Sequence, residues 1–119
     1  MDDSITIEEL KGKVARFCED RDWNQFHNPK DLAIGISTEA NELLDIFRFQ
    51  TKKQMKELLE QPESREHIEE EIADTLFFLL RFAQMNQIDL HLALEDKMKK
   101  NGKRYSIEES RGKNQKIRE

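Results

Sequence analysis

Apolar residues recur near the start of the chain at the spacing of an amphipathic helix. Leu10, Val14 and Cys18 follow one another at intervals of four, in a stretch that begins after the hydroxyl residues Ser4 and Thr6. Residues three and four apart lie on one face of a helix, and Ser or Thr commonly caps the first turn. The pattern therefore predicts a first helix over residues 6–22.

Two longer helices are predicted on either side of the stretch EQPES. Asn28 followed by Pro29 is typical of a helix start, because the Asn side chain caps the first turn and Pro is tolerated at the first helical position. We expect the second helix over residues 29–49. The third is expected over residues 64–85, with Ser64 as its cap.

A fourth helix and a polar tail complete the chain. Asp89 can cap a helix that ends near Asn101, where Gly102 would supply a left-handed exit. Nearly all side chains over residues 106–119 are charged or polar, which predicts a tail that is mobile or orders only against a partner. We therefore expect an all-α, four-helix-type bundle domain over residues 1–105, followed by that tail.

The composition supports a single helical domain. The chain has 119 residues, of which 38% are charged and 36% are hydrophobic, with four Gly and two Pro. Many charges and few turn residues favour helices with solvated outer faces over a β fold. The third predicted helix is apolar round most of its circumference, which indicates self-association as a homodimer or homotetramer.

Charge and apolar run length exclude several classes of protein. A formal charge of -5 argues against sequence-independent nucleic acid binding, which needs many Lys and Arg on phosphates. The longest apolar run covers residues 76–80, too short to cross a membrane, and no signal peptide is recognisable. Cys18 is the single cysteine, so no intrachain disulfide or cysteine-rich zinc site can form. These features lead us to expect a cytoplasmic protein.

Four carboxylates lie in or beside the apolar stripes of the second and third predicted helices: Glu39, Glu42, Glu71 and Asp74. On a helical wheel at about 100° per residue, each pair has i, i+3 spacing on the side that should face other helices. The positions four residues before and after each acid hold no Lys or Arg that could form a helix salt bridge. The usual interpretation of a helical Glu as a paired surface charge therefore does not fit.

Acids gathered between two helices repel one another and would lose several kcal/mol to desolvation unless a cation neutralised them. Carboxylate ligands suit Mg²⁺, with Mn²⁺ as a second possibility. A di-iron site of the ferritin type is the rival interpretation, but it requires Glu-x-x-His pairs. None of the three His residues has a Glu three positions before it. The acids therefore predict a magnesium site.

The motifs EANE (residues 39–42) and EIAD (71–74) carry a family resemblance. Their order resembles the ExxE…ExxD signature of the MazG-like all-α nucleoside triphosphate pyrophosphatases. The stretches RDWNQFH and KMKKNGKRY resemble the small single-domain branch that includes the dCTP pyrophosphatases. The likeness covers roughly residues 10–105. It implies cleavage of a nucleoside triphosphate between the α and β phosphates, with Mg²⁺ held by Glu39, Glu42, Glu71 and Asp74.

An aromatic group in the polar connection after the first predicted helix is a candidate base-binding surface. Trp23 and Phe26, with His27 beside them, could hold a base by stacking and hydrogen bonding, or could simply cover the end of the bundle. The resemblance favours base binding. Phe49 stands where the dCTP-like members often have Trp, so we include it among the substrate contacts.

A basic cluster near the end of the fourth predicted helix suits the outer phosphates. Lys97 and Asn101 share one helix face, and Arg104 and Tyr105 follow just past the predicted end. The cations would counter phosphate charge, and the neutral groups would fix orientation. The same charges could equally be favourable partners of a helix C-terminus.

Two functions from different classes follow. The first is a Mg²⁺-dependent pyrophosphohydrolase that removes excess or non-canonical deoxynucleoside triphosphates, with Glu42 as our choice for the group that orients or deprotonates the attacking water. The second is a non-catalytic helical interaction module whose acids bind a structural cation. The absence of a glycine-rich phosphate loop of the Walker type argues against γ-phosphate transfer.

Overall fold

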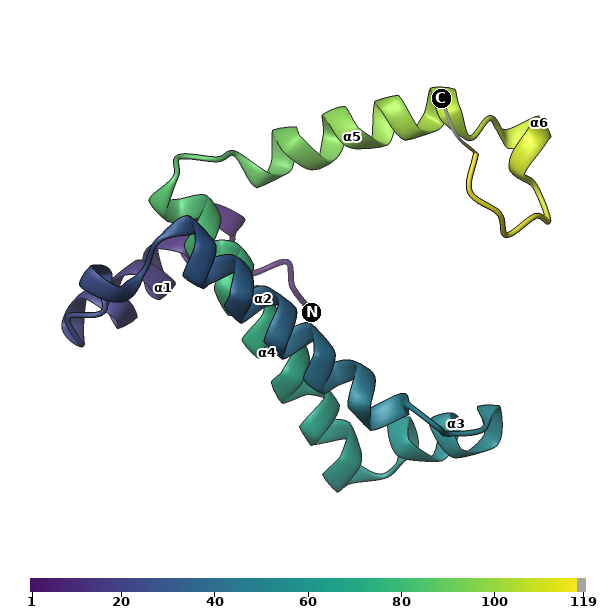
Figure 1. Ribbon diagram of the computed structural model, residues 1–119, viewed down its shortest axis with the longest axis horizontal. Helices are drawn as coiled ribbons and strands as arrows, with labels where there is room; N and C mark the ends of the chain where they lie inside the picture. The colour runs from purple at the N-terminus through teal and green to yellow at the C-terminus, as the bar shows by residue number, and fades with distance from the viewer. Residues whose placement is uncertain (118–119) are drawn as a thin grey trace. The chain divides into compact units, whose positions relative to one another are not determined.

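Helices make up all the regular secondary structure in the computed structural model, which describes residues 1–117. They are, in chain order, α1 (Ile7–Asp20), the 3-10 turn η1 (Asn24–Phe26), α2 (Pro29–Phe47), α3 (Lys52–Glu60), α4 (Pro62–Met85), α5 (Leu90–Arg104) and α6 (Ile107–Ser110) (Figure 1). The all-α prediction is confirmed. The bundle type and self-association stay predictions.

The chain divides into two compact units, residues 1–86 and the part from Gln87 onward. The first contains α1 to α4, and the second contains α5 and α6. The predicted boundary between the domain over residues 1–105 and its tail stays a prediction, although α6 places one short helical turn within that tail. Across the described residues, no helix combines the length and the apolar character needed to cross a membrane.

Side-chain caps determine where most of the helices begin. Thr6 of α1, Asn28 of α2 and Asp89 of α5 each accept a hydrogen bond from the backbone N–H three residues later, at 2.9 to 3.1 Å. Each of these bonds satisfies an amide that the helix itself leaves without a partner, and such a cap is typically worth about 1 kcal/mol. These three predicted starts are confirmed.

Two predicted boundaries are wrong. α4 begins at Pro62, because Pro fits the first helical position, and the Ser64 hydroxyl donates to the backbone oxygen of Leu58 instead of capping the helix. α5 continues through Gly102 to Arg104, and Gly102 does not adopt a positive φ. A helix can contain Gly when the residues around it favour the helix, so Gly102 is not its exit.

The helix α3 was missed. α2 ends at Phe47, and Phe49 adopts the left-handed φ of 67°, which interrupts the helical path. Thr51 then starts a new helix with a capping box: its hydroxyl accepts from the Gln54 backbone N–H, and the Gln54 side-chain oxygen accepts from the Thr51 backbone N–H. The sequence pattern did not separate this nine-residue helix from the polar connection.

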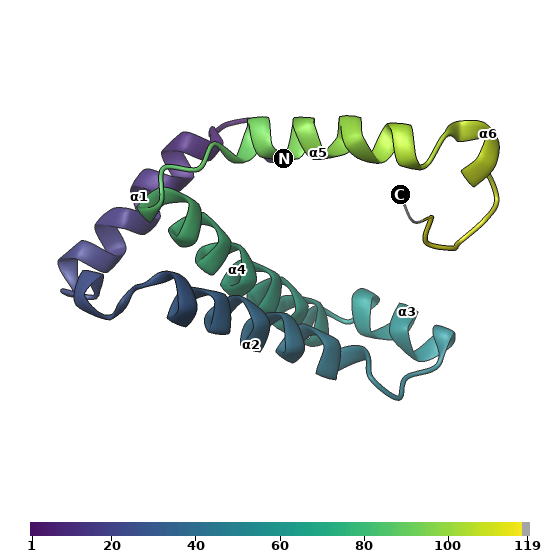
Figure 2. The ribbon, with the colours of Figure 1, turned by 45° about the horizontal axis from the view of Figure 1, so that its top comes forward.

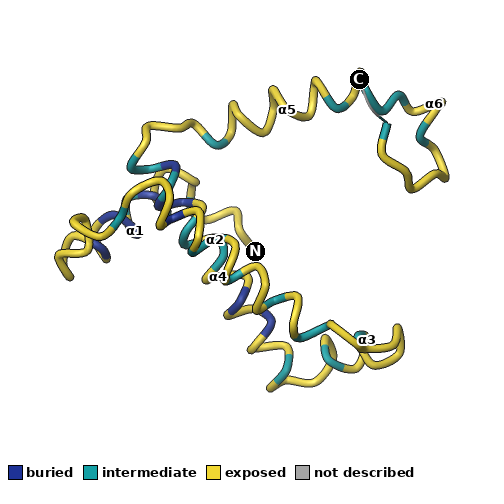
Figure 3. The backbone as a smooth tube through the Cα atoms, viewed as in Figure 1, coloured by how far each residue is buried: buried dark blue, intermediate teal, exposed yellow. Residues whose placement is uncertain are grey.

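The central helix of the first unit is α4, which contacts α1, α2 and α3. α2 and α4 run antiparallel along each other, and α3 lies against the first turns of α4 (Figure 2). In Figure 3 the buried parts of the backbone tube are dark blue. The buried apolar residues come from α1, α2 and α4: Val14, Ala15, Cys18, Leu32, Ile68, Leu80 and Ala83. Cys18 is therefore a core residue.

At Gly35 the backbone of α2 lies close to a side chain of α4. A Cβ atom placed there would lie 2.7 Å from ring carbons of Phe78 on α4, far inside van der Waals contact. The lack of a side chain at Gly35 therefore lets the α2 backbone lie against the Phe78 ring. Glu39 follows Gly35 by one turn, so this contact helps to set the separation at which the two helices present their acids.

We predict that Gly35→Ala destabilises the protein by about 1 to 3 kcal/mol, because the added methyl overpacks the contact with Phe78. Urea unfolding would measure this change. Gly12→Ala in α1 is the matched control, since its Cβ would meet only the end of the Arg16 side chain at 3.8 Å. That control should gain about 0.5 to 1 kcal/mol from helix propensity. Equal effects of the two substitutions would contradict the close-approach account.

Candidate functional site

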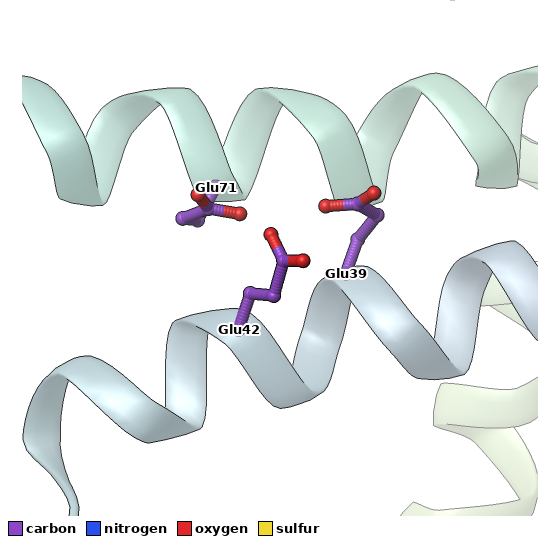
Figure 4. Close-up of side chains that lie close together, drawn as sticks. All are labelled: Glu39, Glu42 and Glu71. Carbon is purple, nitrogen blue, oxygen red and sulfur yellow. The ribbon is translucent and has the colours of Figure 1, made fainter.

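Three of the four predicted acids meet between α2 and α4. Glu39 and Glu42 extend from α2 and Glu71 from α4, and one carboxylate oxygen of each lies within 4.8 Å of the others (Figure 4). The i, i+3 spacing puts both α2 acids on the face that meets α4. Glu71 is buried, Glu39 is half-buried and Glu42 is exposed. The exposure of the three acids therefore increases from Glu71 through Glu39 to Glu42.

Asp74, the fourth predicted acid, is exposed and lies outside this group of three. It comes one helical turn after Glu71 on α4. Its charge still reaches the group, because it contributes to raising the pKa of both Glu39 and Glu71. The assignment of Asp74 as a fourth ligand stays a prediction.

Burial is the main cause that raises the pKa of Glu39 and of Glu71, and the neighbouring Glu42 and Asp74 charges add to it. The Oε2 atoms of Glu39 and Glu71 are buried without a hydrogen-bond partner in the described part of the chain. A buried carboxylate oxygen without a donor is unfavourable. These unpartnered oxygens fit a hard divalent cation such as Mg²⁺ or Mn²⁺, which prefers oxygen ligands.

A cavity of about 320 Å³ opens beside the acids. Its lining residues are Glu42, Asp45, Ile46, His67 and Glu71. This volume lies at the lower end of the range for small-molecule sites. Oδ1 of Asp45 lies 4.0 Å from Nη1 of Arg48 across one helical turn, an ordinary arrangement for a surface acid. The acid cluster is thus accessible from solvent on the Glu42 side.

His67 is a site residue that the sequence analysis missed. Its Nε2 atom lies 3.3 Å from Oε1 of Glu71, one turn later on α4. His67 is neither a Lys nor an Arg, the residue types that most often pair with an acid along a helix. The i, i+4 spacing of His67 and Glu71 was the signal that could have found this pair.

Arg81 ties the connection between α1 and α2 to α4 and was also missed. It is 1% exposed. Its Nε donates to Nδ1 of His27 at 2.9 Å, Nη1 donates to Oε1 of Gln84 at 2.7 Å, and Nη2 donates to Oδ1 of Asn24. Arg81 lies among apolar residues in the sequence, which gives no sign of a polar partner. The structure shows that two of its acceptors, His27 and Asn24, lie in the connection between α1 and α2.

His27 is held as a neutral imidazole by this contact. A ring nitrogen that accepts a hydrogen bond carries no proton, so the proton of the neutral ring is on Nε2. Burial lowers the pKa of His27 below its ordinary value, and the nearby Arg81 charge lowers it further. The predicted contact of His27 with substrate stays a prediction, and an Nε2–H group there would act as a hydrogen-bond donor.

Trp23 is an exposed residue that packs against one aromatic neighbour. Its ring meets Phe17 edge-on with centroids 5.6 Å apart, and Phe17 meets Phe77 of α4 at 5.8 Å. Trp23 is nevertheless 37% exposed, and Phe26 is more exposed still. The ring is therefore anchored from one side and accessible from another, which is compatible with both the core and the base-binding interpretations.

Phe49 lies just beyond the end of α2 and is 89% exposed. The Arg48 guanidinium lies over its ring, 4.8 Å from the centroid. Its backbone φ of 67° is uncommon for a bulky residue. Its role as a substrate contact stays a prediction.

The predicted phosphate-binding residues are in the second unit. Lys97 is exposed and Asn101 half-buried on α5, which also contains Arg104, with Tyr105 as the next residue. The Arg104 guanidinium lies 5.3 Å from the Tyr105 ring centroid, and its Nε donates to the backbone oxygen of Ile117. Their contact with the phosphates of a substrate stays a prediction.

Comparisons with known proteins found a matching family and several similar proteins. The model of the MazG-like family matches residues 34–119. Rat dCTP pyrophosphatase 1 is 34% identical over 107 residues, which cover 90% of this chain and 63% of the rat protein. The human protein of the same name is 32% identical over 114 residues, covering 96% and 67%. The chain thus spans about two thirds of the length of these relatives.

A solved structure is similar as well. It is the crystal structure of a pyrophosphatase from Archaeoglobus fulgidus DSM 4304, with a TM-score of 0.78 and 38% sequence identity. The match covers 84% of this chain and 92% of the archaeal one. The similarity therefore extends over most of both chains.

We predict that His27 makes stability fall in mildly acidic solution. The folded-state pKa lies below the ordinary value of about 6.5, so the unfolded chain binds the proton first as the pH falls. The stabilisation is present above about pH 6.5 and is lost as the pH falls from there through the folded-state pKa. Urea unfolding at about pH 7.5 and about pH 5.5 would show the loss.

As the pH falls, protonation of Glu39 and Glu71, whose pKa values are raised, favours the folded state and opposes the effect of His27. The contribution of His27 is therefore measured by comparing variants. His27→Gln should show a weaker acid loss than the wild type, whereas the control His91→Gln, at an exposed position of α5, should follow the wild type. An unchanged pH dependence in His27→Gln would contradict the neutral, Arg81-bound imidazole.

Proposed function

Because the chain belongs to the MazG-like family, we propose that it is a Mg²⁺-dependent nucleotide pyrophosphohydrolase. It cleaves a nucleoside triphosphate between the α and β phosphates and releases a monophosphate and pyrophosphate. The observation that carries this proposal is the meeting of Glu39, Glu42 and Glu71, with two buried oxygens that have no partner. The names of the rat, human and archaeal relatives support the reaction type.

The acids divide the work according to their burial. Glu39 and Glu71, which offer the unpartnered oxygens, hold the cation together with Asp74. Glu42 is the exposed member of the group and lines the cavity, so it is best placed to orient or deprotonate the attacking water. When bound, the cation neutralises phosphate charge and lowers the pKa of that water.

The proposed substrate contacts form two groups, one in each unit of the chain. Trp23 and His27 recognise the base by stacking and by the Nε2–H donor of the imidazole. Phe49 follows the other end of α2, whose 19 residues span about 28 Å, so within one chain it is a separate candidate contact and does not share a base with Trp23 and His27. On the phosphate side, Lys97 and Arg104 counter charge, while Asn101 and Tyr105 fix orientation. The substrates are excess or non-canonical deoxynucleoside triphosphates, and a panel of canonical and modified triphosphates assayed for pyrophosphate release would identify them.

A homodimer or homotetramer is part of the proposal. Ile72, Leu76 and Leu79 are spaced by four and three residues on α4 and are each at least two-fifths exposed. They form an apolar stripe along one face of the central helix. An exposed stripe of this kind on a helix otherwise committed to the core is typical of a protein–protein interface.

We predict that Glu71→Gln and Asp74→Asn each abolish turnover without destabilising the protein in the absence of metal. Both changes remove a charge from a group of mutually repelling carboxylates, so the fold should be equally stable or more stable. Pyrophosphate release and metal-free thermal melting measure the two effects. Glu69→Gln is the control on the same helix, because Glu69 is paired with Arg65 at the surface. Wild-type turnover by folded Glu71→Gln would disprove the metal assignment.

We predict that the attacking oxygen ends in the nucleoside monophosphate. Hydrolysis in ¹⁸O-labelled water should label the monophosphate and leave pyrophosphate unlabelled, because the proposed site acts on the α-phosphorus. Mass spectrometry of both products reads the position of the label. Label in orthophosphate together with a nucleoside diphosphate would mean γ-cleavage and would contradict the proposal. Label in pyrophosphate would move the attack to the β-phosphorus.

If the acids serve an interaction module instead, Mg²⁺ should raise the melting temperature while every triphosphate in the panel stays intact. Melting with and without Mg²⁺ and nucleotide, run beside the pyrophosphate assay, separates this outcome from catalysis.

A further inference from the structure

His67 lines the same cavity as Glu42 and Glu71 and has its Nε2 atom 3.3 Å from Oε1 of Glu71. α4 sets this arrangement, since residues four apart are neighbours on one face of a helix. The His67 side chain is 58% exposed, while the Glu71 side chain is 11% exposed. An accessible imidazole therefore reaches from the cavity wall to a buried carboxylate.

The two oxygens of Glu71 have different surroundings. Oε1 is the atom beside His67, and Oε2 is buried without a hydrogen-bond partner in the described residues. A carboxylate that binds a cation through one oxygen is commonly held through the other by a hydrogen-bond donor. This donor restricts rotation of the carboxylate and keeps the ligating oxygen in place. The surroundings of Glu71 match this division.

We propose that His67 is a positioning residue for the metal site: it holds Oε1 of Glu71 and thereby leaves Oε2 for the cation. This inference rests on the proposed metal-dependent function. His67 acts as a donor from Nε2, which the neutral Nε2–H tautomer provides. It acts through Glu71 and does not itself bind the cation.

A second His–Glu pair in the chain shows what an ordinary surface contact looks like. His91 and Glu95 on α5 have the same i, i+4 spacing, with Nε2 and Oε1 3.7 Å apart. Both side chains are more than half exposed, and Glu95 is not part of an acid cluster in the described chain. Such exposed pairs contribute little. The pair His91–Glu95 therefore supplies a control with matched spacing and chemistry.

The test measures binding of Mn²⁺ alone to the full chain by calorimetry and by electron paramagnetic resonance of the free ion. His67→Ala should weaken Mn²⁺ binding about 10- to 100-fold, the range for loss of a partner that orients a ligand. His67→Gln should stay within a few-fold of the wild type, because the Gln amide can also donate to Glu71. His91→Ala should bind Mn²⁺ like the wild type. Metal-free melting verifies that each variant is folded.

Glu71→Gln separates failure of the inference from failure of the proposed function. Wild-type Mn²⁺ affinity in His67→Ala, with binding lost in Glu71→Gln, would overturn the role of His67 and leave the metal site intact. Wild-type affinity in Glu71→Gln would overturn both. Nitrogen coupling to bound Mn²⁺ that disappears in His67→Ala would make His67 a direct ligand and would also overturn the positioning role.

Discussion

Mutual repulsion of carboxylates between α2 and α4 is the constraint on which the rest of this structure depends. Burial and neighbouring negative charge both raise the pKa of Glu39 and Glu71, which means that their ionised forms are unfavourable in the folded chain. The helices must therefore be held together by contacts elsewhere. The approach of Gly35 to Phe78 and the packing of α4 against three helices provide those contacts. The stability of the helix packing therefore comes from these contacts and not from the acids.

The same helix that forms the core also positions the proposed site. Ile68 and Leu80 of α4 are buried among the helices, while Glu71 lies between them in sequence and faces the acids of α2. A side chain on a packed helix moves less than one on a loop, and a metal site needs ligands held within a fraction of an ångström. Glu71 and Arg81 are the two buried polar residues of α4, and each connects to a different part of the proposed site.

Sequence patterns predicted most of the helices and the acids, but they did not predict the polar contacts between distant segments. Helix starts could be predicted at Thr6, Asn28 and Asp89, because capping is a local interaction. The acids stood out because no Lys or Arg lay four residues away, which is again local. Arg81 and His27 are 54 residues apart, so nothing in the sequence pattern links them. The helical path is interrupted at Phe49 by one positive φ, and a Phe residue gives no sequence signal for that conformation.

The geometry of α4 also relates the two ends of the proposed site. Glu71 belongs to the acid cluster, and Arg81, ten residues later, holds His27 and Asn24 of the connection before α2. A helical rise of about 1.5 Å per residue separates their backbones by roughly 15 Å. One helix thus sets the spacing between Glu71 of the acid cluster and Arg81, which holds His27. In the proposed function, the base and phosphates of a nucleotide must match this distance along α4.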